Sequence, residues 1–528
     1  MKSSLSSKQI QLQLSRGFFF VFFLGLLVRL FVCLNTFIIN PDGALYIHQA
    51  RAMYYGEWEK LTTCGMSYLS IYPFFIAGAY TIFHNWIVAA KSVSFFFGSI
   101  TLIPVYLILR RFFDDKISAL STLVFSLIPV FVVGSADIIK GPIYWFFLTT
   151  GLYLFISQIN KNRYRLSLLL CCLSFLIAAS ARIESVLFII VSCLFLMAVK
   201  QEKRIEKSVI FVLPVVLILI IVFFSSLFIG VPVKDIFRIN EVADKLSMSI
   251  VEYKHLRAVL AELVNHPPVG VSRYFFEIVR NLVWLIALGT VFIYIVKVFF
   301  YPFFLIFIAG IGDIRSKMRK DHCLRYLVLL SMSSIILLYF HVLQTWFISR
   351  RFLVPFVLPS LVFLGFGLEN IVSFLRSKFK LNARTALVIV CLFILSFGLA
   401  KNLKPREVDK LVFKEIGEFI AEQEGINHVI PVAASLYTIR WISFYSNLNY
   451  PGSPCPQPYN HFTEIIGKNY KQFVKNLKIR GMKYFLWEEK HWPRDRFDFI
   501  KELKPEDFKK IGRWEHPDTG ELILFKIK

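Results

Sequence analysis

The chain has 528 residues, of which 56% are hydrophobic and 16% aromatic. This composition excludes an ordinary soluble protein, and the length allows a membrane domain followed by a second module. The formal net charge of +25 does not indicate nucleic-acid binding, because the basic residues gather in short clusters between apolar runs. That placement is typical of cytoplasmic loops in membrane proteins.

Eleven apolar runs approach the roughly 20 residues that a helix needs to cross a bilayer. They cover residues 17–39, 86–109, 117–134, 142–159, 166–181, 185–199, 208–230, 283–310, 326–348, 352–373 and 385–400. A further stretch, residues 71–84, suits a half-span or a re-entrant helix. The sequence therefore predicts an α-helical polytopic membrane protein with about 11–13 spans.

Six basic clusters set the orientation of this protein. With eleven spans all six fall on one side, which the positive-inside rule assigns to the cytoplasm. They start at Lys2, Arg110, Lys161, Lys200, Arg315 and Arg376. We therefore expect a multi-pass protein of the plasma (inner) membrane with a cytoplasmic N-terminus, whose first apolar run is retained because no small-residue cleavage site follows it.

The outer face then holds several loops and the whole tail. Residues 40–70, 135–141, 182–184 and 349–351 lie there, together with a helical, amphipathic loop over 231–280 that suits the membrane interface. Residues 1–400 form the transmembrane domain. Residues 401–528 contain strand-like stretches (HVIPVAA, KYFLWE, LILFKI) among helical ones, and they predict a small extracytoplasmic α/β domain.

The first outer loop begins with NPDGALYIHQARAMYYGEW. Asn40 and Pro41 end the first span, and Asp42 is expected to cap a helix over about 43–55 that Gly56 stops. His48 and Arg51 lie on this helix. One interpretation is an interfacial helix anchored by its aromatic residues; the other is a part of an active site.

The other outer turns carry charges that are costly near a membrane. Asp137 and Lys140 share the turn GSADIIKGP, Arg182 and Glu184 share the next, and Arg350 and Arg351 are adjacent in a third. Each pair of opposite charges also suits a local ion pair that closes its turn. Acids and cations gathered on one face suit chemistry on a lipid-linked phosphate, where cations hold the phosphate and a carboxylate takes a proton from a hydroxyl.

No cysteine or histidine spacing indicates a metal site. The eight cysteines include no CxxC pair. Cys64 and Cys455 both fall on the outer side, which allows a disulfide between them. We therefore expect no cofactor, and a divalent metal stays an open alternative that no spacing supports.

Several stretches resemble the GT-C superfamily of membrane glycosyltransferases, in the branch with protein O-mannosyltransferases and the lipid A aminoarabinose transferase. They are PDGALYIHQARAMYYGEW, SLIPVFVVGSADIIKGPIYWFFLTTGLYLF, AASARIESVLFII and SRRFLVPFVLPSLVFLGFGLENI, with ISFYSNLNYPG and GMKYFLWEE in the tail. The resemblance implies that Asp42 is the catalytic or acceptor-orienting acid, that Asp137 is a second acid, and that the donor is a sugar on a polyprenyl phosphate. Gly43 stands where many relatives have a second acid, which favours a lone general base over a metal chelate.

Together these observations predict an inverting glycosyltransferase that moves a hexosyl or pentosyl group from a polyprenyl-phosphate carrier to a lipid, glycan or protein hydroxyl. The expected catalytic residues are Asp42 and Asp137. The expected substrate-binding residues are His48, Arg51, Lys140, Arg182, Glu184, Arg350 and Arg351.

Two alternatives remain open. A transporter or flippase of a lipid-linked saccharide would carry its charges at the bilayer midplane and often two repeated halves. Here the charges lie at span ends, with Arg29 and Lys297 as exceptions. A non-catalytic assembly factor is the other alternative.

Overall fold

The computed structural model of the chain describes residues 14–61, 66, 68–158, 164–199, 203–229, 239–312, 314–425, 427–454 and 462–528. Cys64 and Cys455 lie outside these residues. The chain forms two compact units, each built from separate pieces. The membrane unit comprises Met1–Arg29, Phe97–Val133 and Gly141–Leu403, and the loop–tail unit comprises Leu30–Phe96, Gly134–Lys140 and Lys404–Lys528.

These two units divide the chain differently from the single boundary expected at 400/401. The tail begins near that point, but it shares its unit with the first outer loop and with the turn 134–140. The first outer loop, the turn 134–140 and the tail are therefore parts of one body.

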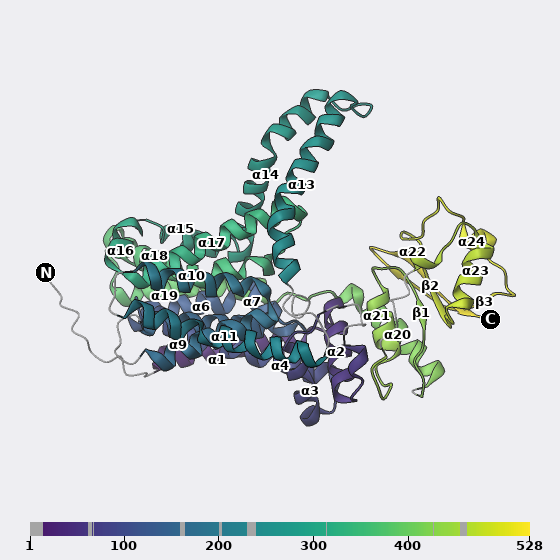
Figure 1. Cartoon of the computed structure of the whole chain (residues 1–528), viewed down its shortest axis with the longest axis horizontal. Coiled ribbons are helices and arrows are strands. Elements are labelled where there is room, and N and C mark those ends of the chain that lie inside the picture. The colour runs from purple at the N-terminus through teal and green to yellow at the C-terminus, as the bar shows by residue number, and fades with distance from the viewer. Residues whose placement is uncertain are drawn as a thin grey trace. The chain divides into compact units, whose positions relative to one another are not determined.

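The eleven predicted apolar runs are all helical. Their helices are α1 (Arg16–Leu34), α4 (Trp86–Ile100), α5 (Leu102–Arg110), α6 (Asp115–Leu127), α7 (Pro129–Ala136), α8 (Gly141–Gln158), α9 (Arg165–Ala181), η2 (Ile183–Ser185), α10 (Val186–Ala198), α11 (Arg204–Ile229), α14 (Arg273–Phe299), α15 (Tyr301–Ala309), α17 (His322–Thr345), η3 (Arg350–Leu353), α18 (Val354–Lys378) and α19 (Ala383–Asn402), and α16 (Ile314–Lys320) lies between two of them (Figure 1).

Six helices of the described ranges are long and apolar enough to cross a membrane, and the bent pair α6–α7 makes a seventh. The pair bends by 58° at Ile128, whose backbone is extended because Pro129 disfavours a helical conformation in the residue before it. The remaining runs include shorter apolar helices such as α9. The chain is thus a polytopic helical membrane protein, as the composition predicts.

Helices α15 and α18 pack backbone against backbone. A Cβ atom on Gly367 would lie 1.8 Å from the carbonyl oxygen of Ile306, and one on Gly310 would lie 1.9 Å from that of Phe363. Neither glycine can therefore gain a side chain without moving a helix. Small residues allow this kind of close approach between helices in membranes.

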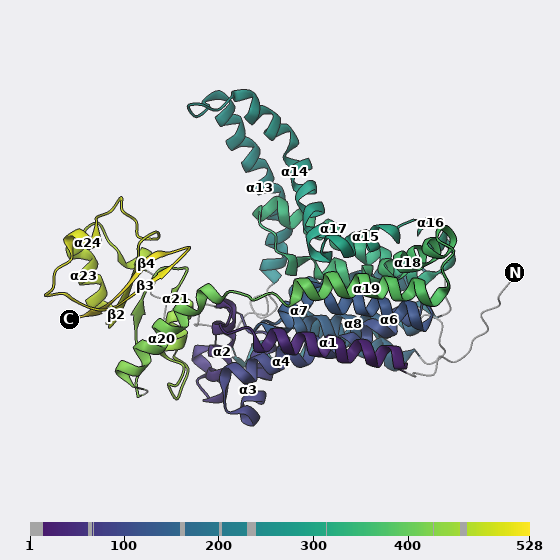
Figure 2. The same ribbon diagram turned by 180° about the vertical axis from the view of Figure 1, so that it is seen from behind.

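The loop expected over 231–280 is helical in its described part. Helix α13 (Ile239–Asn265) pairs with α14, and Figures 1 and 2 show the two helices extending beyond their neighbours in the membrane unit. Tyr274, Phe275 and Ile278 are exposed on the first turns of α14. Exposed aromatic and aliphatic side chains suit a membrane interface, and the interfacial position of this loop stays a prediction.

The loop–tail unit combines loop helices with a small sheet. Its elements, besides the start of α4, are α2 (Pro41–Tyr54), η1 (Trp58–Lys60), α3 (Tyr72–Phe83), η4 (Val408–Lys410), α20 (Leu411–Glu424), β1 (Val432–Ala433), α21 (Ile439–Ser446), α22 (Phe462–Ile465), α23 (Tyr470–Ile479), β2 (Tyr484–Glu488), α24 (Phe499–Glu502), β3 (Phe508–His516) and β4 (Gly520–Ile527). The strand order is β1-β2-β4-β3. Strand β1 is parallel to β2, and the other pairs are antiparallel. This sheet confirms the predicted α/β tail.

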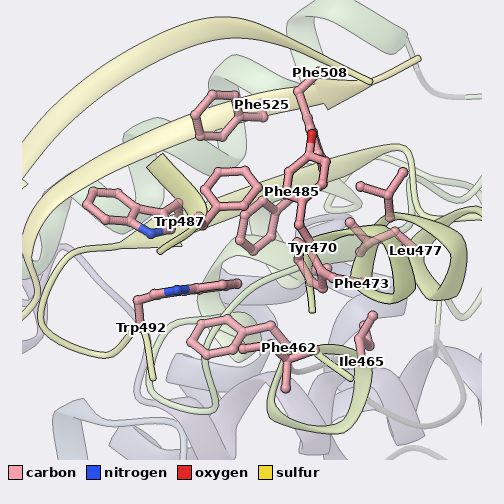
Figure 3. Packing of buried hydrophobic residues seen from close by; sticks show 14 of the residues in the cluster. Phe462, Ile465, Tyr470, Phe473, Leu477, Phe485, Trp487, Trp492, Phe508 and Phe525 are labelled. Carbon is pink, nitrogen blue, oxygen red and sulfur yellow. The ribbon is translucent and has the colours of Figure 1, made fainter. Parts of the chain in front are cut away.

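An aromatic core holds the tail together. Phe473 of α23 meets Phe485 of β2 edge to face at 5.1 Å between ring centroids, and Trp492 packs 5.4 Å from Phe473 (Figure 3). Both phenylalanines are fully buried. Such pairs add to the free energy gained by burying apolar area, so the tail has a hydrophobic core of its own.

The contact between α15 and α18 makes a stability prediction. Gly367→Ala should lower the free energy of unfolding by about 1–3 kcal/mol, the usual cost of overpacking, because its Cβ meets a backbone carbonyl. Thermal melting of the detergent-solubilised protein measures this as a lower Tm. Gly289→Ala on α14 is the control, since no atom lies within 4 Å of its added Cβ. Equal Tm values for the two variants would contradict the close packing.

Candidate active site

Helix α2 places the first candidate acid. The N-cap is Asn40, whose side chain accepts a hydrogen bond from the backbone N–H of Gly43 at 2.9 Å. The expectation that Asp42 caps the helix was wrong, because Pro41 suits the first helical position and the helix begins there. Asp42 lies in the first turn, where the helix dipole favours a negative charge.

The carboxylate of Asp42 is partly open to solvent. Its side chain is 36% exposed, and its Oδ1 lies 3.2 Å from Nη1 of Arg440 on α21. Arg440 is a functional candidate that the sequence did not reveal, because it lies 398 residues away along the chain. The pair leaves the carboxylate accessible to a ligand.

The turn that carries Asp137 packs on the first turn of α2. The Nδ2 of Asn40 donates to the carbonyl of Ile138 at 3.1 Å, and a Cβ on Gly43 would lie 2.9 Å from the Cβ of Ile138. The hydroxyl of Ser94 donates to the carbonyl of Ile139 at 3.3 Å. Glycine at position 43 thus permits the close contact that brings the segments of Asp42 and Asp137 together.

Asp137 is more buried than Asp42 and pairs with a different arginine. Its Oδ2 lies 3.6 Å from Nη2 of Arg406, and its side chain is 17% exposed. Burial raises the pKa of Asp137 above its ordinary value, while Arg406 and Lys91 oppose the rise. The two acids therefore have different surroundings, which allows them different roles.

Lys91 and Lys140 also belong to this unit. Lys91, on α4, donates to the carbonyls of Cys33 in the last turn of α1 and of Thr36 just after it, where a cation satisfies terminal carbonyls. In the sequence Lys91 lies inside a predicted apolar run, so it was not among the expected site residues. Lys140 donates to the hydroxyl of Tyr68 at 3.0 Å and lies 4.6 Å from the centre of its ring.

Arg51 lies in the interior of the loop–tail unit. It is fully buried, and its Nε donates to the carbonyl of Gly452 at 2.7 Å, while Nη1 donates to the carbonyls of Asn447 and Leu448 at 3.2 Å each. Nη2 donates to the carbonyl of Tyr450. These bonds occupy the guanidinium with the tail, so we assign Arg51 a structural role.

His48 is buried beside Arg51 on the same helix. Neither ring nitrogen has a hydrogen-bond partner among the described residues, and the ring meets Phe444 at 5.8 Å between centroids. Burial and the charge of Arg51 lower the pKa of His48 to about 3. The imidazole is therefore neutral at physiological pH and offers no positive charge to a phosphate.

The remaining candidates belong to the membrane unit. Arg182 donates from Nη1 to the carbonyl of Arg351 at 2.9 Å, and its guanidinium lies 5.8 Å from the ring centre of Tyr144 and 5.3 Å from that of Phe352. Glu184 is half-buried in η2. The side chains of Arg350 and Arg351 are exposed on η3. Arg182 thus joins two predicted outer turns, and the two arginines of η3 remain accessible.

One group of possible metal ligands occurs in the described tail. Ligand atoms of Asp409, His516 and Asp518 lie within 4.8 Å of one another. Nδ1 of His516 accepts a bond from the backbone N–H of Asp518 at 3.2 Å, and Nε2 faces Asp409 at 3.3 Å. A neutral imidazole that accepts at Nδ1 carries its proton on Nε2, where it donates to Asp409 and lacks a lone pair for a metal. Hydrogen bonds thus join His516 to Asp409 and to the backbone of Asp518.

Comparisons with known proteins place this fold. Residues 70–228 match the family of dolichyl-phosphate-mannose-protein mannosyltransferases. The structure of ArnT from Cupriavidus metallidurans bound to undecaprenyl phosphate is similar, with a TM-score of 0.58 and 11% identity over 97% of this chain and 98% of that one. No curated protein sequence matches the chain.

A second structure of similar fold is the oligosaccharyltransferase AglB from Archaeoglobus fulgidus, in complex with an inhibitory peptide and a dolichol-phosphate. Its TM-score is 0.57 at 12% identity, over 96% of this chain and 74% of that one. At such identities the likeness concerns the fold. The chain therefore shares the fold of these two membrane proteins, and its residues 70–228 match a mannosyltransferase family.

Proposed function

We propose that the protein transfers a sugar from a polyprenyl-phosphate carrier to a hydroxyl of a lipid, glycan or protein at the outer face of the plasma membrane. The observation that carries this proposal is the accessible carboxylate of Asp42, held in the first turn of α2 beside Arg440. Support comes from the fold, because related structures hold undecaprenyl phosphate or a dolichol-phosphate.

The proposed reaction is a single displacement. The acceptor oxygen attacks the anomeric carbon, the bond from that carbon to the phosphate oxygen breaks, and the polyprenyl phosphate leaves with the bonding electrons. Attack from the face opposite the phosphate inverts the anomeric configuration. Asp42 takes the proton of the acceptor hydroxyl, and Asp137 orders the donor or the acceptor.

Cations at the ends of the predicted outer segments are proposed to stabilise the leaving phosphate. They are Lys140, Arg182, Arg350 and Arg351. A cation fixed near a developing negative charge lowers the energy of the transition state. Arginine suits this role because its planar fork matches two phosphate oxygens. Glu184 is proposed to contact the sugar, and no metal enters the proposed reaction.

Assay against a panel of polyprenyl-phosphate sugars also tests the transporter alternative. A transferase converts the donor to free polyprenyl phosphate when an acceptor is present in detergent. A flippase moves the lipid-linked sugar between leaflets of a vesicle and leaves it chemically unchanged. Intact donor after incubation with every acceptor tried, together with movement in vesicles, would overturn the proposal.

The role of Asp42 predicts the effect of its amide. Asp42→Asn keeps the size of the side chain and leaves the Asn40 cap in place. It should reduce turnover by about 10²-fold or more, the usual scale for loss of a general base, because an amide cannot take the acceptor proton. Steady-state kinetics with a folded, membrane-inserted variant measures this. Turnover near that of the parent would leave Asp42 without a catalytic role.

The arginines of η3 are expected to differ. Adjacent residues in a helix do not share a face, so we expect only one of Arg350 and Arg351 to grip the phosphate. Its replacement by Gln should weaken binding of undecaprenyl phosphate by about tenfold or more, since each lost charge-assisted hydrogen bond contributes about 1.5–3 kcal/mol. The Gln variant at the neighbouring position serves as the control. Lys at the sensitive position should restore part of the affinity.

Binding of undecaprenyl phosphate can be followed by microscale thermophoresis. Parent-like affinity in both Gln variants would move the phosphate site elsewhere, with Lys140 and Arg182 as the leading candidates.

The proposed outer location predicts the topology of the tail. Reporter fusions after Gly398 and Lys404 should give extracytoplasmic activity, because the basic clusters assign the opposite side to the cytoplasm. A fusion after Lys116, within one of those clusters, is the control and should report the cytoplasm. Cytoplasmic activity at both Gly398 and Lys404 would reverse the orientation and exclude the outer-face reaction.

A further inference from the structure

Each of the two loop acids meets an arginine of the tail. Asp42 pairs with Arg440 on α21, and Asp137 pairs with Arg406, which precedes η4. All four residues belong to the loop–tail unit. The arginines come from two separate tail segments, so the tail supplies a cation to both acids independently.

The backbone around Arg440 is fixed to the start of α2. The indole N–H of Trp441 donates to the carbonyl of Ile39 at 2.6 Å, and the hydroxyl of Tyr445 accepts from the backbone N–H of Ile39 at 3.1 Å. Ile39 lies three residues before Asp42. Because both ends of the Asp42–Arg440 pair are attached to anchored backbone, the guanidinium has a defined position relative to the carboxylate.

Stability alone is a weak reason for the pair of Asp42 with Arg440. An ion pair between partly exposed side chains contributes little to folding, and the side chains of Arg440 and Asp42 are 32% and 36% exposed. The tail has an independent aromatic core, and Arg51 already attaches it to α2. What this pair adds is a fixed orientation of the Asp42 carboxylate.

Arg406 has a further donor available for a ligand. Its Nη2 faces Asp137, while its Nη1 is buried without a hydrogen-bond partner among the described residues. A buried guanidinium N–H without a partner is costly. A substrate oxygen beside Asp137 would satisfy it.

We propose that Arg440 and Arg406 are positioning residues, contributed by the tail, that orient Asp42 and Asp137 for sugar transfer. This inference rests on the proposed function and deepens it. The tail then completes the transfer site. Arg440 holds the carboxylate that takes the acceptor proton, and Arg406 holds Asp137 and donates from Nη1 to the substrate.

The central variant is Arg440→Gln, measured with undecaprenyl-phosphate sugars from the donor panel. We expect kcat to fall by about tenfold or more, because small displacements of a reacting group are costly, while KM for the donor changes little. Arg440→Lys should recover part of kcat, since it restores the charge without the fork. Arg406→Gln should lower kcat/KM by a similar factor.

The matched control is Arg480→Gln. Arg480 also belongs to the tail, is 35% exposed and lies 3.8 Å from a carboxylate, that of Glu464. This variant should keep the kcat of the parent. Combining Arg440→Gln with Asp42→Asn should cost little beyond Asp42→Asn alone, because a positioning residue acts through the group that it orients. Full kcat in Arg440→Gln, or a multiplicative loss in the double variant, would overturn the inference.

Hydrogen exchange separates this inference from the proposed function. In Arg440→Gln the amides of residues 42–48 should exchange at least about twofold faster than in the parent and in Arg480→Gln, because the first turn of α2 loses a tether. If the parent transfers no sugar from any donor, the proposed function fails. Hydrogen exchange alone then tests whether Arg440 orients Asp42. Unchanged exchange in that case overturns the positioning role, and faster exchange supports it.

Discussion

The buried guanidinium of Arg51 is the contact on which the candidate site depends. Its three nitrogens donate to four backbone carbonyls between Asn447 and Gly452, so one side chain of the first loop organises a turn of the tail. Burial lowers the pKa of Arg51 to about 10, which leaves it charged at neutral pH. A buried charge is costly unless hydrogen-bond partners compensate it, and the carbonyls of the tail do so for Arg51. The first loop and the tail are consequently one body, and the helix that carries Asp42 is attached to the tail.

The two acids have distinct surroundings. Asp42 stays partly exposed at a helix N-terminus, whereas Asp137 lies in a buried turn with a raised pKa. Pairs of carboxyl groups in contrasting environments are typical of sites that move protons. The contact of Gly43 with Ile138 brings the segments of the two acids together. Glycine after Asp42 therefore has a packing role, besides leaving that position without a second acid.

The fold was largely predictable, because apolar length and basic clusters are local properties of the sequence. Every predicted apolar run is helical, and the strand-like stretch KYFLWE contains β2. The number of long spans was less accessible, since a proline such as Pro129 divides one apolar run into two helices. The identification of Asn40 as the cap required knowing where the helix starts.

The site was only partly predictable. Asp42, Asp137 and Lys140 share one unit. They could be selected from the sequence because a short outer turn contains few charged residues. Arg406 and Arg440 were hidden among the many polar residues of the tail, where a charge usually indicates a solvated surface. Their partners lie far away in sequence, and no local pattern reports such a pairing. Likewise, the spacing of His48 and Arg51 on α2 could not reveal which helix face the tail covers.

The discontinuous make-up of the loop–tail unit has a consequence for biosynthesis. Its first piece, Leu30–Phe96, leaves the ribosome long before Lys404–Lys528. The carbonyls that Arg51 needs and the arginines that face the two acids are therefore absent until the last quarter of the chain has been made. Until then Arg51 lacks the acceptors that it has in the folded unit, so the candidate site is assembled last. A ribosome that stops before the tail would leave an inserted but incomplete protein, with its first outer loop exposed to proteases.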